Sequence, residues 1–252
     1  HYPTHTMQTA RGAKVSPIYD RLVARHAYFR DVSGWAGADW FGTSAADTKA
    51  KSARLGWDRL DWFGYWEAEH RAAREGVILM DMSFMSKFLV EGRDAGAMLN
   101  WISANNVDGA KDTITYTQWL DVHGKLQADL TVTKLDDDKF WVVASDTVER
   151  HVETWMKRAI REDQHAHVTN VTGGYGQINI QGPRSRELMQ LVTSADMSGA
   201  AFPFRHAREI DIGYARVLCI RITYLGELGY ELYLLAEQTT HVYDRLVEHG
   251  AK

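Results

Sequence analysis

Two short runs of alternating residues and a third run that is mostly apolar follow one another between positions 114 and 144, separated only by tight turns. ITYTQWL leads into the turn Asp121-Val-His-Gly124, LQADLTVTKL leads into three aspartates from Asp136, and KFWVVA completes the series. Alternation of this kind predicts half-buried β-strands, and short links rich in Gly and Asp predict hairpins. Strands joined by such short links run antiparallel. The chain is therefore expected to contain an antiparallel sheet.

Helical periods lie between and around these strands. We expect helices near 17–28, 65–76, 93–105, 148–160, 184–192 and 240–249. Further strands are expected at 88–92, 165–171 and 175–182, with a long hairpin at 208–235 that turns near Ile212. The Gly-, Ala- and Trp-rich stretch from Val32 to Trp66 is interpreted as packed loops anchored by aromatic side chains. The pattern predicts an α+β fold of mostly antiparallel sheets with packed helices.

The composition excludes several classes of function. The 252 residues are 45% hydrophobic, enough for one large domain or two small ones. A net charge of -4 offers no cationic field for a nucleic acid. The single cysteine, Cys219, excludes a disulfide within the chain and fits a reduced compartment. We find no signal-peptide pattern and no apolar run of about 18 residues, so we expect no membrane partner and a cytoplasmic location, or the mitochondrial matrix in a eukaryote.

Neither the glycine-rich run nor the histidine pair predicts a cofactor site. In TGGYGQINIQG the glycines precede a strand, whereas the dinucleotide fingerprint places them between a strand and a helix, so a turn explains them better. His165 and His167 share one face of a strand, but no third ligand lies near them in the sequence. We interpret them as a surface pair, and we expect no metal.

Asp129 is a more interesting polar residue. In its strand the apolar side chains face one way, while Gln127, Asp129 and Thr131 face the other. Solvent exposure alone explains such a face. The strand of Tyr116 lies across the 121–124 turn, however, which allows a tyrosine and a carboxylate to share one wall of a pocket.

The stretch TYLGELGYELYL, residues 223–234, holds two carboxylates in different settings. Glu227 lies between two glycines in a predicted turn, where a solvated carboxylate needs no further explanation. Glu231 lies inside the strand YELYL, either as an edge or polar-face residue or as a group that binds a ligand. A carboxylate fixed on a strand can accept two parallel hydrogen bonds from a flat heterocycle, and the neighbouring tyrosines offer stacking surface.

Five segments together resemble the glycine-cleavage T protein (aminomethyltransferase) family, and most closely the folate-binding C-terminal half of the FAD-dependent sarcosine and dimethylglycine dehydrogenases. They are SPIYDRLVARHAYF, WFGYWEAEHRAAREGVILMDMSFMSKFLVEG, TITYTQWLDVHGKLQADLTVTKL, INIQGPRSRELMQ and RITYLGELGYELYL, in family order over most of residues 15–247. The resemblance implies the first two subdomains of the T-protein fold, without its C-terminal barrel. The first would be a discontinuous folate-binding subdomain of 1–86 plus 171–252, and the second an inserted α+β subdomain of 87–170.

The resemblance also implies which residues form the site. Asp129 matches the catalytic aspartate, and the positions that match cofactor-binding residues are Tyr116, Tyr224, Glu231 and Met85. Met85 corresponds to the methionine of the family's SHMGEF pattern, although Phe84 and Ser86-Lys87 replace its His and Gly-Glu. The asparagine of the VVNAAN pattern is replaced around Ala144 and Ser145, so that folate contact is not carried over.

The function implied is one-carbon transfer. Tetrahydrofolate would take up a methylene group from a methylamine-derived iminium, with Asp129 as proton acceptor and electrostatic partner. FAD would lie in an N-terminal oxidase domain outside this chain, in cis or in trans. The chain begins at His1 without a methionine and its first 17 residues show no period, so we expect a segment of a longer polypeptide. The alternatives are a folate-binding or regulatory module without turnover and, as a weaker match, a demethylase with a sulfonium donor.

Overall fold

The structure is a computed structural model that describes residues 9–52 and 57–250. Within those residues the strands form a two-stranded hairpin and two five-stranded sheets, and neighbouring strands in all three are antiparallel. The hairpin consists of β1 (Ala27–Val32) and β2 (Trp35–Phe41). The α+β class and the mostly antiparallel sheets are therefore confirmed.

The first five-stranded sheet has the strand order β10-β11-β12-β9-β3. Its strands are β3 (Ile78–Asp81), β9 (Tyr175–Gln181), β10 (Ala207–Ile212), β11 (Ala215–Ile220) and β12 (Gly229–Leu235). The second sheet has the order β5-β6-β7-β4-β8. Its strands are β4 (Ser86–Glu91), β5 (Thr113–Leu120), β6 (Leu126–Asp136), β7 (Lys139–Ala144) and β8 (His167–Asn170).

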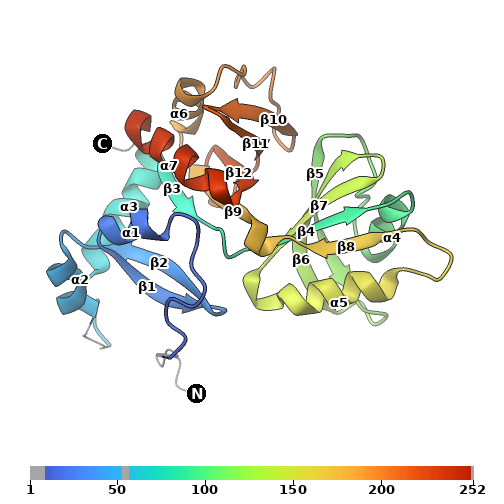
Figure 1. Ribbon diagram of the computed structural model, residues 1–252, viewed down its shortest axis with the longest axis horizontal. Helices are drawn as coiled ribbons and strands as arrows, with labels where there is room; N and C mark the ends of the chain where they lie inside the picture. The colour runs from blue at the N-terminus through green and yellow to red at the C-terminus, as the bar shows by residue number, and fades with distance from the viewer. Residues whose placement is uncertain (1–8, 53–56, 251–252) are drawn as a thin grey trace.

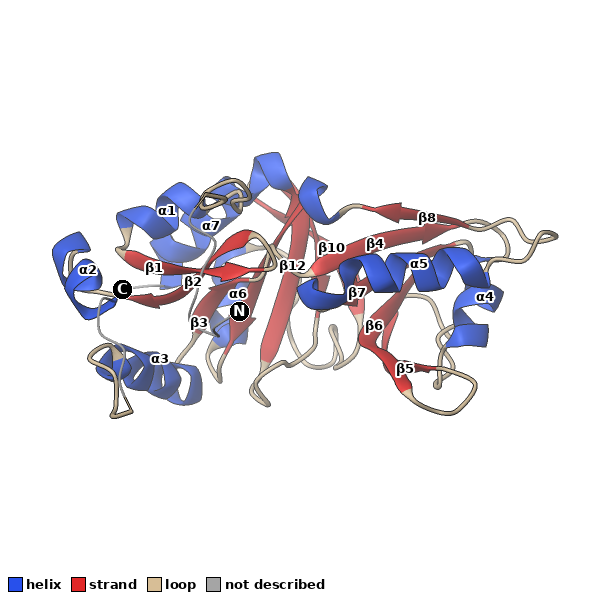
Figure 2. Ribbon diagram, turned by 90° about the horizontal axis from the view of Figure 1, so that it is seen from below, coloured by secondary structure: helices blue, strands red, loops and turns tan. Residues whose placement is uncertain are grey.

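Seven α-helices accompany the sheets in the described residues. They are α1 (Tyr19–Ala24), α2 (Ala45–Ser52), α3 (Phe63–Glu75), α4 (Ala95–Ile102), α5 (Glu149–Ala159), α6 (Ser185–Val192) and α7 (Ala236–Gly250). Figures 1 and 2 show an elongated molecule in which the two five-stranded sheets lie side by side, with the hairpin and α2 at the end away from the second sheet. None of these helices is both long and apolar enough to cross a bilayer.

The chain completes the second sheet within one continuous segment. It forms β3, then all of β4–β8, and then returns to the first sheet with β9. This order supports the division into 1–86 plus 171–252 and an inserted 87–170, which we keep as a proposal.

Three buried clusters hold the fold together. The first packs Ile178, Ile180 and other residues of the first sheet against α1, α6 and α7, and the second packs the second sheet against α4 and α5. A third cluster joins the two sheets through Ile114, Trp141 and Tyr233. The Trp141 ring meets the rings of Tyr175 and Tyr233 edge-on, with centroids 5.0 and 5.5 Å apart.

Several expected elements differ from the structure. The helix expected at 17–28 ends at Ala24, because His26 adopts a positive φ of 63° and the chain turns into β1. The loops expected between Val32 and Trp66 are wrong in part, since β2 and α2 lie there. The expected 208–235 hairpin is three strands, and β3 was not predicted. The ring of Trp40 on β2 is fully buried and stacks on Tyr28 and Tyr65, so the same aromatic anchors stabilise a hairpin and not a loop.

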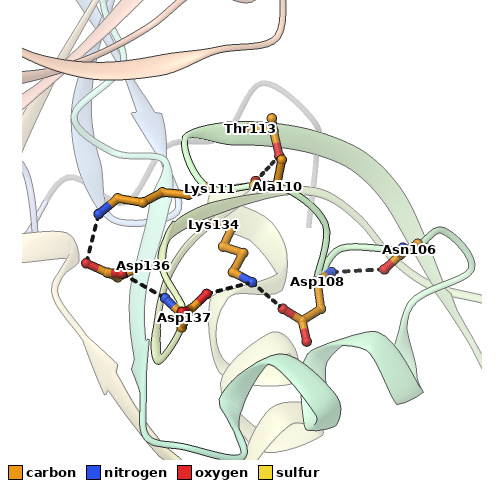
Figure 3. Close-up of polar contacts among 8 residues, drawn as sticks. All are labelled: Asn106, Asp108, Ala110, Lys111, Thr113, Lys134, Asp136 and Asp137. Atoms are coloured by element: carbon orange, nitrogen blue, oxygen red, sulfur yellow. Dashed lines mark hydrogen bonds and ion pairs between the residues drawn. The ribbon is translucent and has the colours of Figure 1, made fainter.

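An ion-pair network attaches the segment between α4 and β5 to the β6–β7 turn (Figure 3). The Lys134 ammonium lies 2.8 Å from Asp108 and 3.3 Å from Asp137, and Lys111 lies 2.9 Å from Asp136. Lys134 is itself buried, whereas Asp137 is exposed. The network therefore fixes a long connection against the sheet whose strands β5 and β6 carry Tyr116 and Asp129.

Candidate functional site

Tyr116 and Asp129 form a hydrogen-bonded pair across β5 and β6. The register pairs Tyr116 with Thr131 and Gln118 with Asp129, which makes the tyrosine and the aspartate diagonal neighbours on one face. The Tyr116 hydroxyl donates to Asp129 Oδ2 at 2.9 Å, and the Tyr116 side chain is 53% exposed. The hydrogen bond to Asp129 raises the pKa of the Tyr116 phenol, which therefore stays a donor. The structure thus brings together the aspartate and the tyrosine that sequence patterns placed near each other.

Glu231 lies on β12, between β11 and β9, and is therefore not an edge residue. Its residue is 9% exposed, and both carboxylate oxygens accept hydrogen bonds. Tyr233 donates to Oε2 at 2.5 Å and Asn179 donates to Oε1 at 3.2 Å. Burial raises the pKa of Glu231, and these two hydrogen bonds oppose the shift. The edge position considered from sequence is therefore wrong, and Glu231 lies on a polar face that is buried.

Met85 and Tyr224 line a cavity of about 840 Å³. Tyr224 is 66% exposed, so its ring is accessible. The cavity also reaches Ser145, where the resemblance marks a departure from the family pattern. Within the described part of the chain, its lining includes neither the Tyr116–Asp129 pair nor Glu231. The five predicted residues are thus found in three places.

The third buried cluster connects two of these places. Ile114 precedes Tyr116 by two residues on the same face of β5, and Tyr233 follows Glu231 by two residues on the same face of β12. Ile114 and Tyr233 belong to the cluster that joins the sheets. The Tyr116–Asp129 pair and Glu231 therefore flank the same contact between the two sheets.

Two carboxylates that sequence reasoning missed line the cavity. Glu69 on α3 and Asp39 on β2 are partly buried, and Asp39 has Arg30 at 3.3 Å. Burial, reinforced by the charge of Asp39, raises the pKa of Glu69 to about 7. Burial also raises the pKa of Asp39, and Arg30 opposes this. Glu69 lies in WEAEH, a part of the second segment that resembles the family, but the resemblance assigns it no role.

Lys87 supports the turn that carries Met85. Its side chain is fully buried, and Nζ donates to the carbonyl oxygens of Ser83 at 2.8 Å and Met85 at 2.6 Å. Burial lowers the pKa of Lys87 to about 7, and the negative charge of Asp81 opposes that shift. Asp81 in turn accepts hydrogen bonds from the backbone and hydroxyl of Ser83. Lys87, which replaces a residue of the family's SHMGEF pattern, therefore fixes the backbone at Met85.

A row of buried amides was also missed. Gln177, Asn179 and Gln181 alternate with Ile178 and Ile180 on β9, and all three amides are almost completely buried. Their alternation was visible in the sequence and marked a polar face. It did not reveal that this face is buried. Among residues 9–52 and 57–250, no group of three or more His, Cys, Asp or Glu side chains is arranged to hold a metal ion.

Comparison with known proteins identifies related chains. The chain is 33% identical over 250 residues to 4-methylaminobutanoate oxidase (formaldehyde-forming) from Paenarthrobacter nicotinovorans, covering 99% of this chain and 30% of the relative. It is 28% identical over 253 residues to the mitochondrial pyruvate dehydrogenase phosphatase regulatory subunit of Mus musculus, with 99% and 29% covered. It is 30% identical over 246 residues to mitochondrial dimethylglycine dehydrogenase of Mus musculus, with 94% and 27% covered. The chain thus spans less than a third of the length of each of these relatives.

A solved structure shares the fold. The glycine cleavage system aminomethyltransferase T from Bartonella henselae superposes with a TM-score of 0.74 at 19% identity, over 93% of this chain and 57% of that chain. The GCVT N-terminal domain family matches residues 18–252. The resemblance inferred from sequence motifs is therefore confirmed, and the chain belongs to the GCVT N-terminal domain family.

Proposed function

We propose that this chain is a tetrahydrofolate-binding module that transfers one-carbon (aminomethyl or methylene) groups within a larger oxidoreductase of the sarcosine and dimethylglycine dehydrogenase type. The observation that carries the proposal is the hydrogen bond from Tyr116 to Asp129, at 2.9 Å on an accessible sheet face. A carboxylate held in this way is available to accept a proton from a reacting amine. Family membership and the methylamine-oxidising relatives support this chemistry.

The residues present fit a bound reduced folate. Each oxygen of Glu231 has one protein donor and keeps acceptor capacity for one more, which matches two adjacent N–H groups on a pterin edge. The exposed rings of Tyr116 and Tyr224 offer stacking faces, and Met85 adds apolar contact. We propose Glu231, Tyr116, Tyr224 and Met85 as cofactor-binding residues and Asp129 as the catalytic residue.

Bound tetrahydrofolate would supply two amine nitrogens that take up the methylene carbon of an iminium, as the donor amine and one proton are released. Asp129 would hold that proton and would stabilise positive charge on the reacting nitrogen. Tyr116 would keep the Asp129 carboxylate oriented through its hydrogen bond. An FAD oxidase domain, in cis or in trans, would produce the iminium, in keeping with the greater length of the relatives.

The first test is titration with 5-formyltetrahydrofolate, a stable reduced folate, followed by quenching of the nine tryptophans. We expect saturable binding that Glu231→Gln weakens. Glu227→Gln is a matched control, because Glu227 lies in the same stretch but pairs with Arg74 on α3. No binding by folded protein, or equal losses in the two variants, would contradict the site.

A regulatory module without turnover is the second candidate. The 28% identical regulatory subunit favours it, since that relative is named for regulation and not for a reaction. An assay of formaldehyde and tetrahydrofolate conversion separates the two candidates. Conversion above the uncatalysed rate supports the transferase, whereas folate binding without conversion supports the regulatory module.

A further inference from the structure

The surroundings of Glu231 form an ordered polar network inside the first sheet. Glu231 and Tyr233 on β12 face the same way as Asn179 and Gln177 on the adjacent strand β9, in register Glu231–Asn179 and Tyr233–Gln177. All four residues are buried. The intervening residues of both strands point into the apolar first cluster on the opposite face. A polar row of this kind in the centre of a sheet is costly unless its members satisfy one another.

Two hydrogen bonds of this network end on the Glu231 carboxylate, and a third orients one of their donors. Gln177 Nε2 donates to Asn179 Oδ1 at 3.0 Å, which turns the amide nitrogen of Asn179 toward Glu231. Asn179 Nδ2 then donates to Oε1 at 3.2 Å and the Tyr233 hydroxyl to Oε2 at 2.5 Å. Each oxygen of Glu231 thus accepts one hydrogen bond, one from a residue on β12 and the other from a residue on β9.

The donors that stabilise the charge of Glu231 are neutral. Burial raises the pKa of Glu231, and the hydrogen bonds from the uncharged side chains of Tyr233 and Asn179 oppose this rise. The adjacent strand β11 places Ile220 opposite Glu231 and carries the buried thiol of Cys219. Burial raises the pKa of that thiol; Arg208 on β10 lowers it, and the Glu231 charge adds to the rise. The second sheet contributes Trp141, which packs on the Tyr233 ring, and burial keeps Tyr233 protonated by raising its pKa.

We propose that Tyr233 and Asn179 are positioning residues that stabilise the ionised form of Glu231 and orient it toward a ligand edge with two adjacent N–H donors. The proposal rests on the folate-binding function above and deepens it, because it makes ionisation of Glu231 a condition for binding the ligand. A protonated Glu231 loses an acceptor and presents a donor to the N–H groups, so binding should fail as the pH falls through the Glu231 midpoint.

Tyr233→Phe is the decisive variant, because it removes one oxygen and leaves the ring that packs on Trp141. The dissociation constant of 5-formyltetrahydrofolate is measured between pH 5 and 9 for the parent chain and the variant. Loss of a donor raises the Glu231 midpoint, so the pH below which binding fails should move up by about one unit. Asn179→Leu, of similar volume, should move it in the same direction. Weaker binding at every pH with an unchanged midpoint would overturn the proposal.

Tyr175→Phe is the matched control. Tyr175 packs on the same Trp141 ring and lies on β9, but the Glu231 oxygens take their hydrogen bonds from Tyr233 and Asn179. The pH midpoint of folate binding in Tyr175→Phe should equal that of the parent chain. A shift as large as that of Tyr233→Phe would assign the effect to packing and reject the role of the hydroxyl.

A readout without ligand separates this inference from the function on which it rests. The carboxyl carbon of Glu231 can be followed by NMR in protein labelled with carbon-13 glutamate, with Glu231→Gln as the assignment control. A higher Glu231 titration midpoint in Tyr233→Phe without folate binding would keep the network and reject the folate site. An unchanged Glu231 titration midpoint together with folate binding would keep the folate site and reject the role of the network.

Discussion

Asp129 is the residue on which the transferase proposal makes its most direct chemical claim. We expect Asp129→Asn to lower turnover of formaldehyde and tetrahydrofolate by about 100-fold or more, the usual scale for losing a group that transfers a proton. The dissociation constant of 5-formyltetrahydrofolate should change far less, because the amide keeps the shape and still accepts from Tyr116. Steady-state rates and fluorescence titration measure the two effects.

Asp211→Asn is the control for Asp129→Asn, since Asp211 is an exposed carboxylate on β10 of the other sheet. It should leave rate and binding unchanged. A parallel loss of both quantities in Asp129→Asn would mean that the residue binds folate and does not take part in the chemistry.

Glu69 should make the stability of the fold depend on pH. Its pKa is about 7 in the fold against 4.5 for an ordinary glutamate, so the folded state binds more protons between these values. The contribution of Glu69 to the free energy of unfolding is therefore complete below about pH 4.5. It falls as the pH rises toward 7. Glu69→Gln should be more stable than the parent chain at pH 8, by about 1 kcal/mol after allowance for the partial exposure of the side chain.

Urea denaturation at pH 5 and pH 8 measures this difference. Glu75→Gln, an exposed change at the end of the same helix, should show no such pH dependence. If the free energies of unfolding of Glu69→Gln and the parent chain differ by the same amount at pH 5 and pH 8, then the carboxyl of Glu69 is not protonated in the fold.

Sequence reasoning could place Tyr116 beside Asp129 but could not show the surroundings of Glu231. The 121–124 turn fixes the register of two consecutive strands, so the pair follows from local information. The burial of Glu231 depends on the pairing of β12 with β9, which lies about fifty residues earlier and is set by tertiary packing. Glu69 was missed for the same reason, because its cavity is lined by side chains from distant parts of the chain.

At the scale of elements, the Lys134 network is expected to hold the connection between α4 and β5. Lys134→Met keeps most of the buried stem but removes the ion pairs with Asp108 and Asp137. We expect several-fold faster amide hydrogen exchange in residues 104–112, with little change in α5 or β9. Lys139→Met is the control, since its pair with Glu91 at 3.7 Å is exposed. Equal exchange in the two variants would show that packing alone fixes the segment.

The elements that sequence patterns predicted best are strands with a clear apolar pattern between turn residues. The strands β5, β6 and β7 lie within a residue or so of their expected positions, because β5 and β6 largely alternate apolar and polar residues and β7 is a short apolar run bounded by turn residues. The sequence predicted a loop where β2 lies, because the small residues Ala36, Gly37 and Ala38 carry little strand signal and burial does not alternate along the strand. β3 was missed because its four residues lie within a longer apolar stretch and its partner strand, β9, is distant in sequence.

For the whole molecule, Trp141 is expected to couple the two sheets and thereby the two halves of the proposed site. It is 3% exposed and packs on Tyr175 and Tyr233 of the first sheet, while its own strand belongs to the second. Trp141→Ala should lower the free energy of unfolding by about 3–5 kcal/mol, as expected for a buried large aromatic. Trp101→Ala, at a position 79% exposed, should cost less than about 0.5 kcal/mol. Urea denaturation compares the two.

Trp141→Phe tests coupling in a variant that should still fold, because it keeps a ring between the sheets. Glu231 and the Tyr116–Asp129 pair lie on different sheets, so a looser contact between the sheets should misplace one relative to the other. A folate spanning both would then bind about tenfold more weakly, which corresponds to about 1.4 kcal/mol of interaction lost. The Tyr116–Asp129 hydrogen bond itself lies within one sheet and should survive. Unchanged affinity in a demonstrably loosened variant would mean that the ligand contacts only one of the two sheets.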